Sequence, residues 1–260
     1  MHWVSVVIPT YNNAATIERA LNSASRALDV LVGAYPSVPC EVVVINDAST
    51  DRTRAAVAAY AEAHPRVRLL DTPANRGAAA ARNAGVRNAR GDLIFFLDAD
   101  DVFLERHVGV CFEAMRQHPE AQVIRTRIRF DVEIRPEWKR SIENSVPFNI
   151  CVRRWCHDFI GGFLENEVFK AYPCEDSIYR SFLDTFFNVG SIEEETVHHF
   201  RYPGNAFDRQ LKKFQAEAGA GVDTLRPEEK AARPRIDHLV KERTDLIVRQ
   251  HRSLLRKARP

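Results

Sequence analysis

Residues 91–101 read GDLIFFLDADD, an apolar run followed by acidic residues. Its LIFFL segment is a short apolar run of the kind that forms a strand buried on both faces of a sheet. The run leads directly into three carboxylates, Asp98, Asp100 and Asp101. Like charges this close repel one another unless a cation compensates them, and Mg²⁺ and Mn²⁺ prefer oxygen ligands. The same acids would also cap a helix beginning near Val102, because Asp is a good N-cap residue.

The residues before this stretch alternate between apolar runs and helical patterns. Strands are expected at residues 3–9, 41–46, 67–70 and 93–97, and helices at residues 17–31, 52–64 and 78–89. This alternation predicts an open, mostly parallel sheet with helices on both faces, a Rossmann-like α/β fold. Ligands of such sheets bind beyond the carboxyl ends of the strands. Polar side chains gather at those ends: Thr10, Tyr11, Asn12, Asn46, Asp47, Asp71 and Thr72.

The remaining residues follow a less regular pattern. Helices are expected over residues 103–117, 175–187 and 227–258, strands over 124–135 and 196–202, and a loop over 136–148. The period-two alternation of residues 124–135 places Arg125, Arg127 and Arg129 on one polar face. This face would line a groove for a negatively charged acceptor or form an ordinary solvated sheet surface.

The composition is that of a globular chain with no strong bias. Thirty-seven Lys and Arg against 35 Asp and Glu give a net charge of +2 over 260 residues, which removes the simplest argument for nucleic-acid binding. No apolar run approaches the roughly 20 residues that span a bilayer, and the N-terminus lacks a signal-peptide pattern. The five cysteines are scattered, with no pair spaced for zinc. We therefore expect a cytoplasmic protein with reduced cysteines.

Four segments occur in an order and spacing that carry a resemblance. They are VSVVIPTYN (residues 4–12), VVVINDASTDRT (42–53), NRGAAAARNAG (75–85) and GDLIFFLDADD (91–101). Together they resemble the nucleotide-binding half of family 2 glycosyltransferases with the GT-A fold. The resemblance implies a nucleotide-sugar-binding half over residues 1–101, an acceptor-binding and catalytic-base half of the same domain over 102–205, and a C-terminal helical extension over 206–260.

The resemblance also implies roles for residues of the first half. Pro9, Thr10 and Tyr11 would hold the nucleoside, with Tyr11 against the base. Asp47 would read the uracil edge, which favours a UDP-linked donor, and Arg82 would lie near the nucleotide. In the Asp98-Ala99-Asp100 triplet, Asp98 would contact the ribose or sugar, and Asp100 would ligate a divalent cation, Mn²⁺ or Mg²⁺. Asp101 is a weaker candidate for either contact.

The catalytic base is expected in the second half. Glu175-Asp176 opens a predicted helix and resembles the ED motif that supplies the base in this family. A GGF-type turn commonly precedes that motif, and Gly161-Gly162-Phe163 matches it here. The resemblance implies Asp176 as the base and Glu175 as the residue that orients the substrate. Two acids at a helix N-terminus would also simply complement the helix dipole.

A histidine near residue 200 would complete the cation site by the same resemblance. In the commoner pattern it immediately precedes a Pro-Gly pair, and that position here is Tyr202. His198 and His199 lie in a predicted strand and should point to opposite faces. We expect at most one of them to reach the cation, and His199 is the preferred candidate.

These observations predict an inverting, metal-dependent glycosyltransferase that moves a sugar from a nucleotide-sugar donor to a hydroxyl group. The acceptor class stays open among a glycan, a lipid-linked sugar and a small molecule. Two alternatives are a sugar-phosphate nucleotidyltransferase and a catalytically silent nucleotide-sugar-binding protein.

From residue 226 onward, 11 Lys and Arg against five Asp and Glu give a net charge of +6. This basic C-terminal helix would either contact the inner face of a membrane or pack on the body or on a second subunit.

Overall fold

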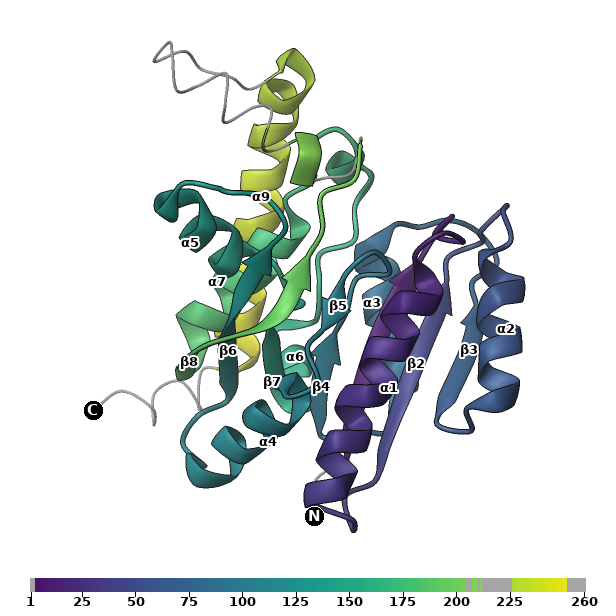
Figure 1. The fold of residues 1–260 in the computed structure, drawn as a ribbon. Helices are drawn as coiled ribbons and strands as arrows, with labels where there is room; N and C mark the ends of the chain where they lie inside the picture. Colours follow the sequence, from purple (N-terminus) through teal and green to yellow (C-terminus); the bar gives the residue numbers. More distant parts are fainter. Residues whose placement is uncertain (1–2, 204–206, 210, 212–225, 252–260) are drawn as a thin grey trace.

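The structure is a computed structural model that describes residues 3–203, 207–209, 211 and 226–251. Its centre is an eight-stranded sheet with the order β3-β2-β1-β4-β7-β6-β8-β5 (Figure 1). The strands are β1 Val4–Thr10, β2 Cys40–Asn46, β3 Val67–Asp71, β4 Leu93–Phe96, β5 Val102–Phe103, β6 Val123–Phe130, β7 Ile150–Arg153 and β8 Val189–His199. Among these described strands, only β5 and β7 run against the common direction, so the sheet is mostly parallel as predicted.

Helices cover the sheet on both faces. They are α1 Ile17–Ala34, α2 Thr53–Ala63, α3 Ala78–Asn88, α4 His107–Gln117, α5 Pro136–Ser145, α6 Arg154–Ile160, α7 Glu175–Phe186 and α9 Pro227–Gln250, with a 3₁₀ helix, η1, at Glu167–Lys170. The alternation of side chains along β1 decides which layer each residue joins. Val4, Val6 and Ile8 pack in the layer that contains residues of α1, α2 and α4. Val7 packs in the layer that contains residues of α3, α6, α7 and α9.

The first half of the chain matches its sequence pattern closely. Strands and helices lie within a few residues of the expected ranges up to β4. Gly85 on α3 shows why a small residue is needed there, because a Cβ at this position would lie 2.2 Å from Cγ1 of Val7 on β1. The close approach brings α3 down onto the sheet, and α3 carries Arg82 and Asn83 at the carboxyl ends of the strands.

The second half departs from the prediction in several places. Residues 136–148 were expected to be a loop, and most of them form helix α5 instead, beginning with Pro136 at its first turn. The helix expected from residue 103 begins at His107, because Val102 and Phe103 pair with β8 as strand β5. The strand expected over 196–202 is the end of the longer β8. Strand β7 and helix α6 were not predicted at all.

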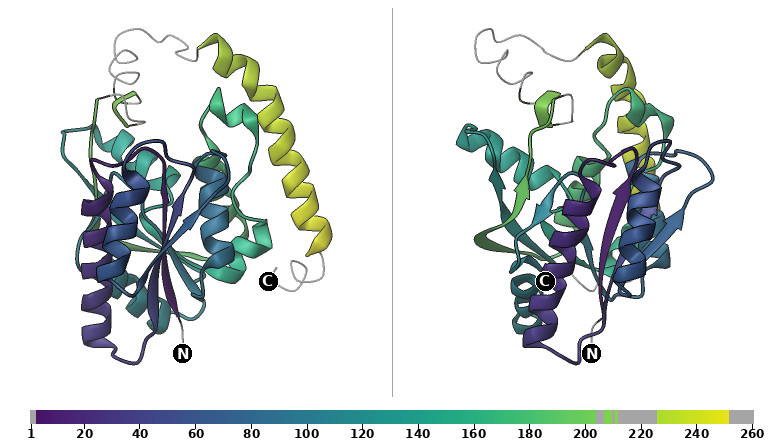
Figure 2. Two further views of the ribbon diagram at one scale, coloured as in Figure 1. Left: turned by 90° about the vertical axis from the view of Figure 1, so that its right-hand side faces the viewer. Right: turned by 45° about the vertical axis from the view of Figure 1, so that its right-hand side comes forward.

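Helix α9 runs along the outside of the second half (Figure 2). Its Ala232, Ile236 and Ile247 are buried against the layer of α3, α6 and α7. Arg243 donates two hydrogen bonds of 2.8 Å to the carbonyl oxygens of Ile160 and Gly161, where α6 ends. A cation at this position satisfies carbonyl groups that the helix leaves unpaired. The predicted continuation of the helix to residue 258 lies outside the described residues.

Candidate active site

A cavity of about 530 Å³ opens at the carboxyl ends of β1 and β4. Both halves of the chain line it. The first half contributes Pro9, Thr10, Tyr11, Asp47, Arg82, Asp98, Ala99 and Asp100, and the second half contributes Glu175, Asp176 and His199. The preferred candidates for the donor, the base and the cation therefore line one cavity, whereas the weaker candidates Asp101 and His198 do not line it. A wider surface hollow of about 740 Å³ lies between α1 and β5 and is lined by other residues, among them Arg19 and Arg26.

Arg82 joins Asp98, predicted to contact the donor, to Asp176, predicted to be the base. Its Nη1 lies 2.6 Å from Oδ1 of Asp176, and its Nη2 lies 2.6 Å from Oδ1 of Asp98. The guanidinium is almost fully buried, while the two carboxylates keep 24% and 29% of their side-chain surface exposed toward the cavity. The planar fork of arginine suits this geometry, because it presents two parallel N–H groups at a fixed spacing. Arg82 was predicted near the nucleotide, and it also holds together acids that lie 78 residues apart in the sequence (Asp98 and Asp176).

Asp176 lies in the first turn of α7, and Glu175 precedes it. Burial raises the pKa of Asp176 to about 7, with Glu175 and Asp98 adding to the rise and Arg82 opposing it. A pKa near neutrality suits a general base, because the carboxyl group is partly ionised at neutral pH and its ionised form accepts a proton readily. Within the described chain, Oε2 of Glu175 is buried and has no hydrogen-bond partner. A hydroxyl group of a bound sugar would satisfy it.

The histidine pair is divided as expected for adjacent residues of a strand. His199 lines the cavity, whereas the ring of His198 stacks on Phe200 at a centroid distance of 3.9 Å. Nδ1 of His199 lies 2.7 and 2.8 Å from the two carboxylate oxygens of Asp101. Burial by itself lowers the pKa of His199, but Asp101, Asp100 and Asp98 outweigh it and raise that pKa.

Tyr202 stands where the commoner pattern has a histidine, and the structure gives it another role. Its hydroxyl group bonds to the guanidinium of Arg19 on α1. The same guanidinium donates a 2.8 Å hydrogen bond to the backbone oxygen of Asp100 and lies 4.1 Å from the ring centroid of Phe200. Arg19 thereby ties the acidic loop after β4 to the chain after β8. Arg19 could not be picked out from its sequence context, because an exposed arginine on a helix has many ordinary roles.

Asp47 is buried at the end of β2 and holds the loop before α3. Its carboxylate accepts hydrogen bonds from the backbone N–H groups of Arg76 and Gly77 and from the hydroxyl of Thr72. Gly77 has a φ of +88°, which favours glycine at this turn. Tyr11 is 44% exposed at the rim of the same cavity. The contacts of Tyr11 and Asp47 with a base stay predictions.

Asn83, next to Arg82 on α3, was not predicted as a site residue. Its amide donates to the backbone oxygen of Phe163 and accepts from the backbone N–H of Phe163, both at 2.9 Å. It also donates to Glu165 at 2.8 Å. A Cβ on Gly162, which has a φ of +71°, would lie 2.5 Å from Oδ1 of Asn83. The GGF turn is thus held against α3, beside the guanidinium that binds Asp176.

The donor set suits a cation that also takes ligands from a bound diphosphate. The described residues contain no group of three or more His, Cys, Asp or Glu side chains placed to enclose a metal ion on their own. Asp100 and His199 line the same cavity, and Nε2 is the ring nitrogen of His199 that Asp101 does not engage. Mg²⁺ and Mn²⁺ commonly bind through one or two protein groups together with substrate phosphates. Asp100 and His199 fit that arrangement.

Comparison with known proteins establishes the family. The glycosyl transferase family 2 profile matches residues 5–183, well over half of the chain, and the chain belongs to this family. It is 38% identical over 98 residues to the dolichyl-phosphate beta-glucosyltransferase ALG5C of Trichomonas vaginalis, a match covering 38% of this chain and 29% of that protein. It is 47% identical over 98 residues to the succinoglycan biosynthesis protein ExoO of Rhizobium meliloti, covering 38% and 25%. These matches span less than a third of either relative.

Solved structures establish the fold. Residues 1–349 of S. aureus TarS in complex with UDP-GlcNAc superpose with a TM-score of 0.64 at 17% identity, covering 88% of this chain and 69% of that one. The mannosyltransferase PcManGT from Pyrobaculum calidifontis, in complex with GDP-Man and Mn²⁺, gives 0.62 at 18% identity, covering 97% and 75%. The predicted GT-A architecture with a C-terminal helix is confirmed.

Proposed function

We propose that this chain is an inverting, metal-dependent glycosyltransferase that moves a sugar from a nucleotide sugar, UDP-linked by preference, to a hydroxyl acceptor. The observation that carries the proposal is the Asp98–Arg82–Asp176 arrangement in one cavity with Asp100 and His199. The solved relatives named above bind UDP-GlcNAc and GDP-Man, which supports a nucleotide-sugar donor in this cavity and leaves the base to experiment.

The donor is proposed to lie against the first half of the chain. Pro9, Thr10 and Tyr11 line the wall after β1, and Asp47 lies at the end of β2. Asp98 lines the cavity from the loop after β4 and would accept a hydrogen bond from a ribose or sugar hydroxyl. A divalent cation held by Asp100 and His199 would, when bound, neutralise charge on the leaving diphosphate.

The acceptor is proposed to approach from the second half. Ile142, Val146 and Phe148 form an apolar part of the cavity wall on the side of α5. Such a surface suits an uncharged acceptor, for example the apolar face of a sugar ring, better than an anionic one. Asp176 would remove the proton of the acceptor hydroxyl. The oxygen of that hydroxyl would bond to the anomeric carbon of the donor sugar while the bond between this carbon and the diphosphate breaks. Attack from the side opposite the leaving group inverts the configuration.

The base assignment is tested by replacing Asp176 with asparagine. Asp176→Asn keeps the shape and the contact with Arg82 but cannot take a proton, so we expect turnover to fall roughly 10²–10⁴-fold. Binding of UDP with Mn²⁺, measured by calorimetry, should change only a few-fold. Asp184→Asn, an exposed acid on the same helix, serves as the matched control and should keep full activity. Full transfer activity in Asp176→Asn would overturn the assignment.

The donor base is tested by thermal shift with UDP-, GDP-, dTDP- and CMP-sugars in the presence of Mn²⁺. We expect the largest shift with a UDP-sugar. A shift confined to GDP-sugars would overturn the uridine preference.

The cytoplasmic location stays a prediction. No helix among the described residues is both long and apolar enough to span a bilayer.

A further inference from the structure

We infer that Asp101 is a positioning residue for His199: its buried carboxylate keeps the imidazole proton on Nδ1 and so presents the lone pair of Nε2 to the divalent cation. The inference rests on the cation site proposed above and assigns a distinct role to the last acid of the DADD run. Asp98 and Asp100 line the cavity, whereas Asp101 is 0% exposed and lies behind His199.

Strand pairing brings the two residues together. β5 and β8 are antiparallel, with Val102 opposite His198 and Phe103 opposite Val197. Continuing this register by one step places Asp101 opposite His199. The two-residue strand β5 therefore has a specific consequence, because it fixes the third acid of the run against the histidine and turns that acid away from the cavity.

The contacts leave this carboxylate little freedom. Nδ1 of His199 lies 2.7 Å from Oδ1 and 2.8 Å from Oδ2 of Asp101. Oδ1 also accepts a 3.1 Å hydrogen bond from the backbone N–H of Phe200. The histidine ring is enclosed by Phe148 and Phe207, with centroid distances of 4.9 and 4.7 Å. Rotating the ring would break the Asp101 contact and disturb this packing.

The chemistry of the pair determines which nitrogen is available. Both oxygens of Asp101 lie within hydrogen-bond distance of Nδ1, and Oδ1 also accepts from the backbone N–H of Phe200. These oxygens act as acceptors, so the nitrogen that faces them carries the proton. The neutral ring then has its lone pair on Nε2, the nitrogen that a metal ion needs. A carboxylate behind a ligating histidine fixes the ring tautomer and makes the ligand more basic, and removing such a partner typically costs about 10–100-fold in metal affinity.

The test measures Mn²⁺ affinity in the presence of saturating UDP, from the loss of the free Mn²⁺ signal in electron paramagnetic resonance. Asp101→Asn keeps an oxygen for Phe200 N–H and turns an amide NH₂ toward Nδ1, which disfavours the Nδ1–H tautomer. We expect Mn²⁺ to bind about 10–100-fold more weakly. The matched control is Asp131→Asn, a neighbouring carboxylate that accepts from the backbone N–H of Arg201, and it should leave the affinity unchanged.

A double-mutant cycle identifies the route of the effect. If Asp101 acts through His199, Asp101→Asn combined with His199→Ala should bind Mn²⁺ no more weakly than His199→Ala alone. Additive losses, or a loss with His199→Ala and none with Asp101→Asn, would overturn the inference while leaving the cation site intact. Unchanged Mn²⁺ affinity in both Asp100→Ala and His199→Ala would instead overturn the proposed cation site.

A spectroscopic measurement on the wild-type protein tests the inference without depending on how any variant folds. Long-range ¹H–¹⁵N spectra of the wild-type protein, followed upward in pH until the ring of His199 is neutral, report which nitrogen keeps the proton. We expect Nδ1–H in the wild type and a shift toward Nε2–H in Asp101→Asn. Nε2–H in the wild type would overturn the inference on its own.

Discussion

Arg82 shows how one buried cation can set the properties of two acids. It meets Asp98 and Asp176 at 2.6 Å each, and Phe163 covers it at 5.3 Å from guanidinium carbon to ring centroid. A buried charge is tolerated only when it is paired, and here both partners are acids of the site. The arginine therefore holds Asp98, the proposed donor contact, beside Asp176, the proposed base, and it opposes the rise in the pKa of Asp176.

The pH dependence of turnover tests this role of Arg82. Asp176 must be ionised to act as a base, so kcat/KM should fall as the pH drops below the Asp176 pKa of about 7. Arg82→Met removes a cation that lowers this pKa, and the acid limb should move to higher pH. Arg82→Lys keeps the charge and should show a smaller displacement along with a lower rate, because lysine lacks the planar fork. An acid limb at the same pH in all three proteins would contradict the prediction.

Single residues of the site were predictable where a short motif carried them. Asp98 and Asp100 follow a buried strand, Asp176 opens a helix, and all three line the cavity. Asn83 and Arg19 were not predictable, because their partners are distant in the sequence and include backbone atoms of Phe163 and Asp100. A hydrogen bond to a backbone atom leaves no trace in the identity of the residue that provides it.

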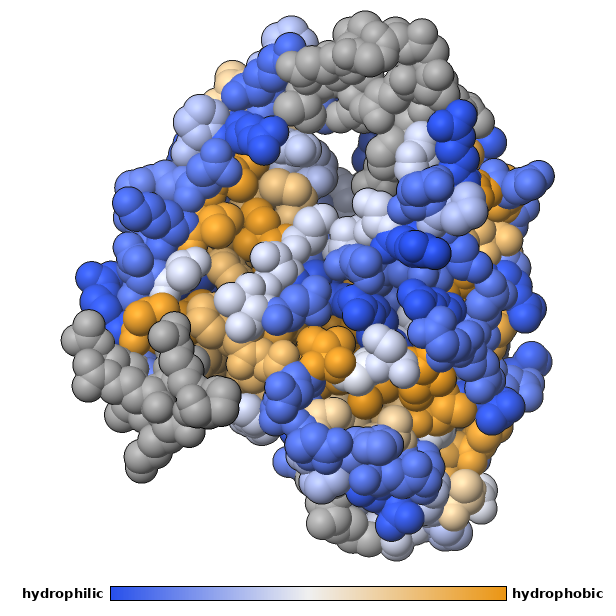
Figure 3. Space-filling view, turned by 90° about the vertical axis from the view of Figure 1, so that its left-hand side faces the viewer, coloured by the Kyte–Doolittle hydropathy of each residue, from blue (hydrophilic) through white to orange (hydrophobic). Residues whose placement is uncertain are grey.

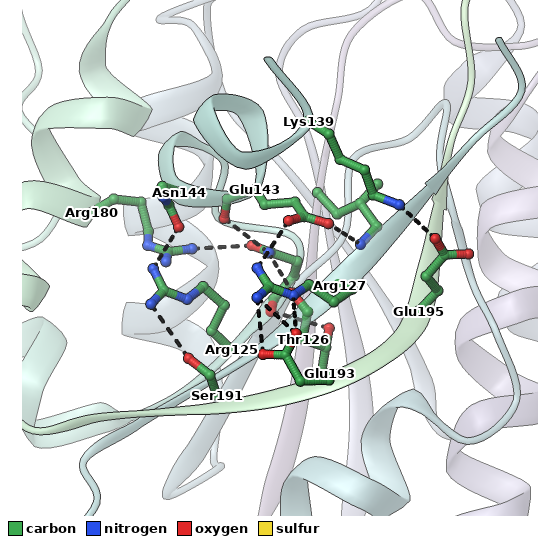
Figure 4. Close-up of polar contacts among 12 residues, drawn as sticks. Arg125, Thr126, Arg127, Lys139, Glu143, Asn144, Arg180, Ser191, Glu193 and Glu195 are labelled. Atoms are coloured by element: carbon green, nitrogen blue, oxygen red, sulfur yellow. Dashed lines mark hydrogen bonds and ion pairs between the residues drawn. The ribbon is translucent and has the colours of Figure 1, made fainter. Parts of the chain in front are cut away.

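At the scale of elements, the second half depends on a network between β6, α5 and β8 (Figure 4). The pairing of β6 with β8 is irregular between Arg125 and Ile128. Glu143 of α5, buried to 99%, accepts from the backbone N–H of Ile128 at 3.0 Å and from Arg127 at 3.0 Å. Arg127 also makes a bidentate pair with Glu193 on β8.

This network also changes how the arginines of β6 are understood. Arg127 pairs with Glu143 and Glu193, and Arg129 lies 3.6 Å from Glu195. Arg125 donates to Asn144 at 2.7 Å (Figure 4). The polar face of β6 is therefore not an open groove for an anionic acceptor, because its charges are used to join α5 and β8 to the strand.

Replacing Glu143 should destabilise the protein through the irregularity in β6. Glu143→Leu leaves the buried N–H of Ile128 without an acceptor, and we expect a loss of about 1–3 kcal/mol in the free energy of unfolding. Glu143→Gln can still accept this hydrogen bond and should lose less. Urea denaturation measures both values, with Glu194→Gln on β8, a more exposed acid, as the control. Equal losses for the leucine and glutamine variants would show that the N–H contact is not the cause.

The elements that the sequence failed to predict share a physical feature. α5 has a charged, weakly apolar sequence, and only Ile142 and Glu143 of it are buried. β5 and β7 have two and four residues, too few for a periodic pattern. Their pairing partners lie on β8, β4 and β6, far along the chain. In contrast, β1 to β4 are continuous apolar runs separated by helices, and such local patterns can be read directly.

At the scale of the whole molecule, the charge of the C-terminal region is distributed unevenly. The described part, residues 226–251, has seven Lys and Arg against five Asp and Glu, so most of the excess comes from Arg252, Arg256, Lys257 and Arg259. Figure 3 shows hydrophobic patches beside hydrophilic surface on the side of the molecule where α5, α7 and α9 lie. Leu246 and Val248 of α9 are 41% and 40% exposed. The buried side chains of α9 pack on the body, one of the options expected from the sequence. Contact of the exposed side of the helix with an anionic membrane surface or with a second subunit stays a prediction.

Vesicle sedimentation distinguishes contact with a membrane surface from contact with a second subunit. Replacing the four basic residues after position 251 with glutamine should weaken partition onto vesicles containing anionic lipid about fivefold per charge, because each contributes about 1 kcal/mol near the surface. Replacing Arg233 on the described helix gives a single-charge control. Partition that is absent in the wild type, with a dimer mass by analytical ultracentrifugation, would favour the second subunit.

Both halves of the chain line the cavity, so we expect a bound nucleotide to stabilise the whole folded domain. UDP would contact the ends of β1, β2 and β4, while a cation would join Asp100 of the first half to His199 of the second. A ligand that binds only the folded state stabilises it by about 2.7 kcal/mol at one hundred times its Kd. For a chain of this size we expect UDP with Mn²⁺ to raise Tm by roughly 5–10 °C.

Removing the metal tests whether the nucleotide and the cation bind cooperatively at one shared site. Because the described residues supply too few ligands to enclose a cation alone, Mn²⁺ without UDP should raise Tm little, and UDP with EDTA should raise it less than UDP with Mn²⁺. The combined shift should exceed the sum of the separate shifts, since each ligand completes the site for the other. Asp100→Ala should abolish this excess while keeping the shift with UDP alone. Additive shifts in the wild type would mean that nucleotide and cation bind independently, and the shared site proposed here would then be wrong.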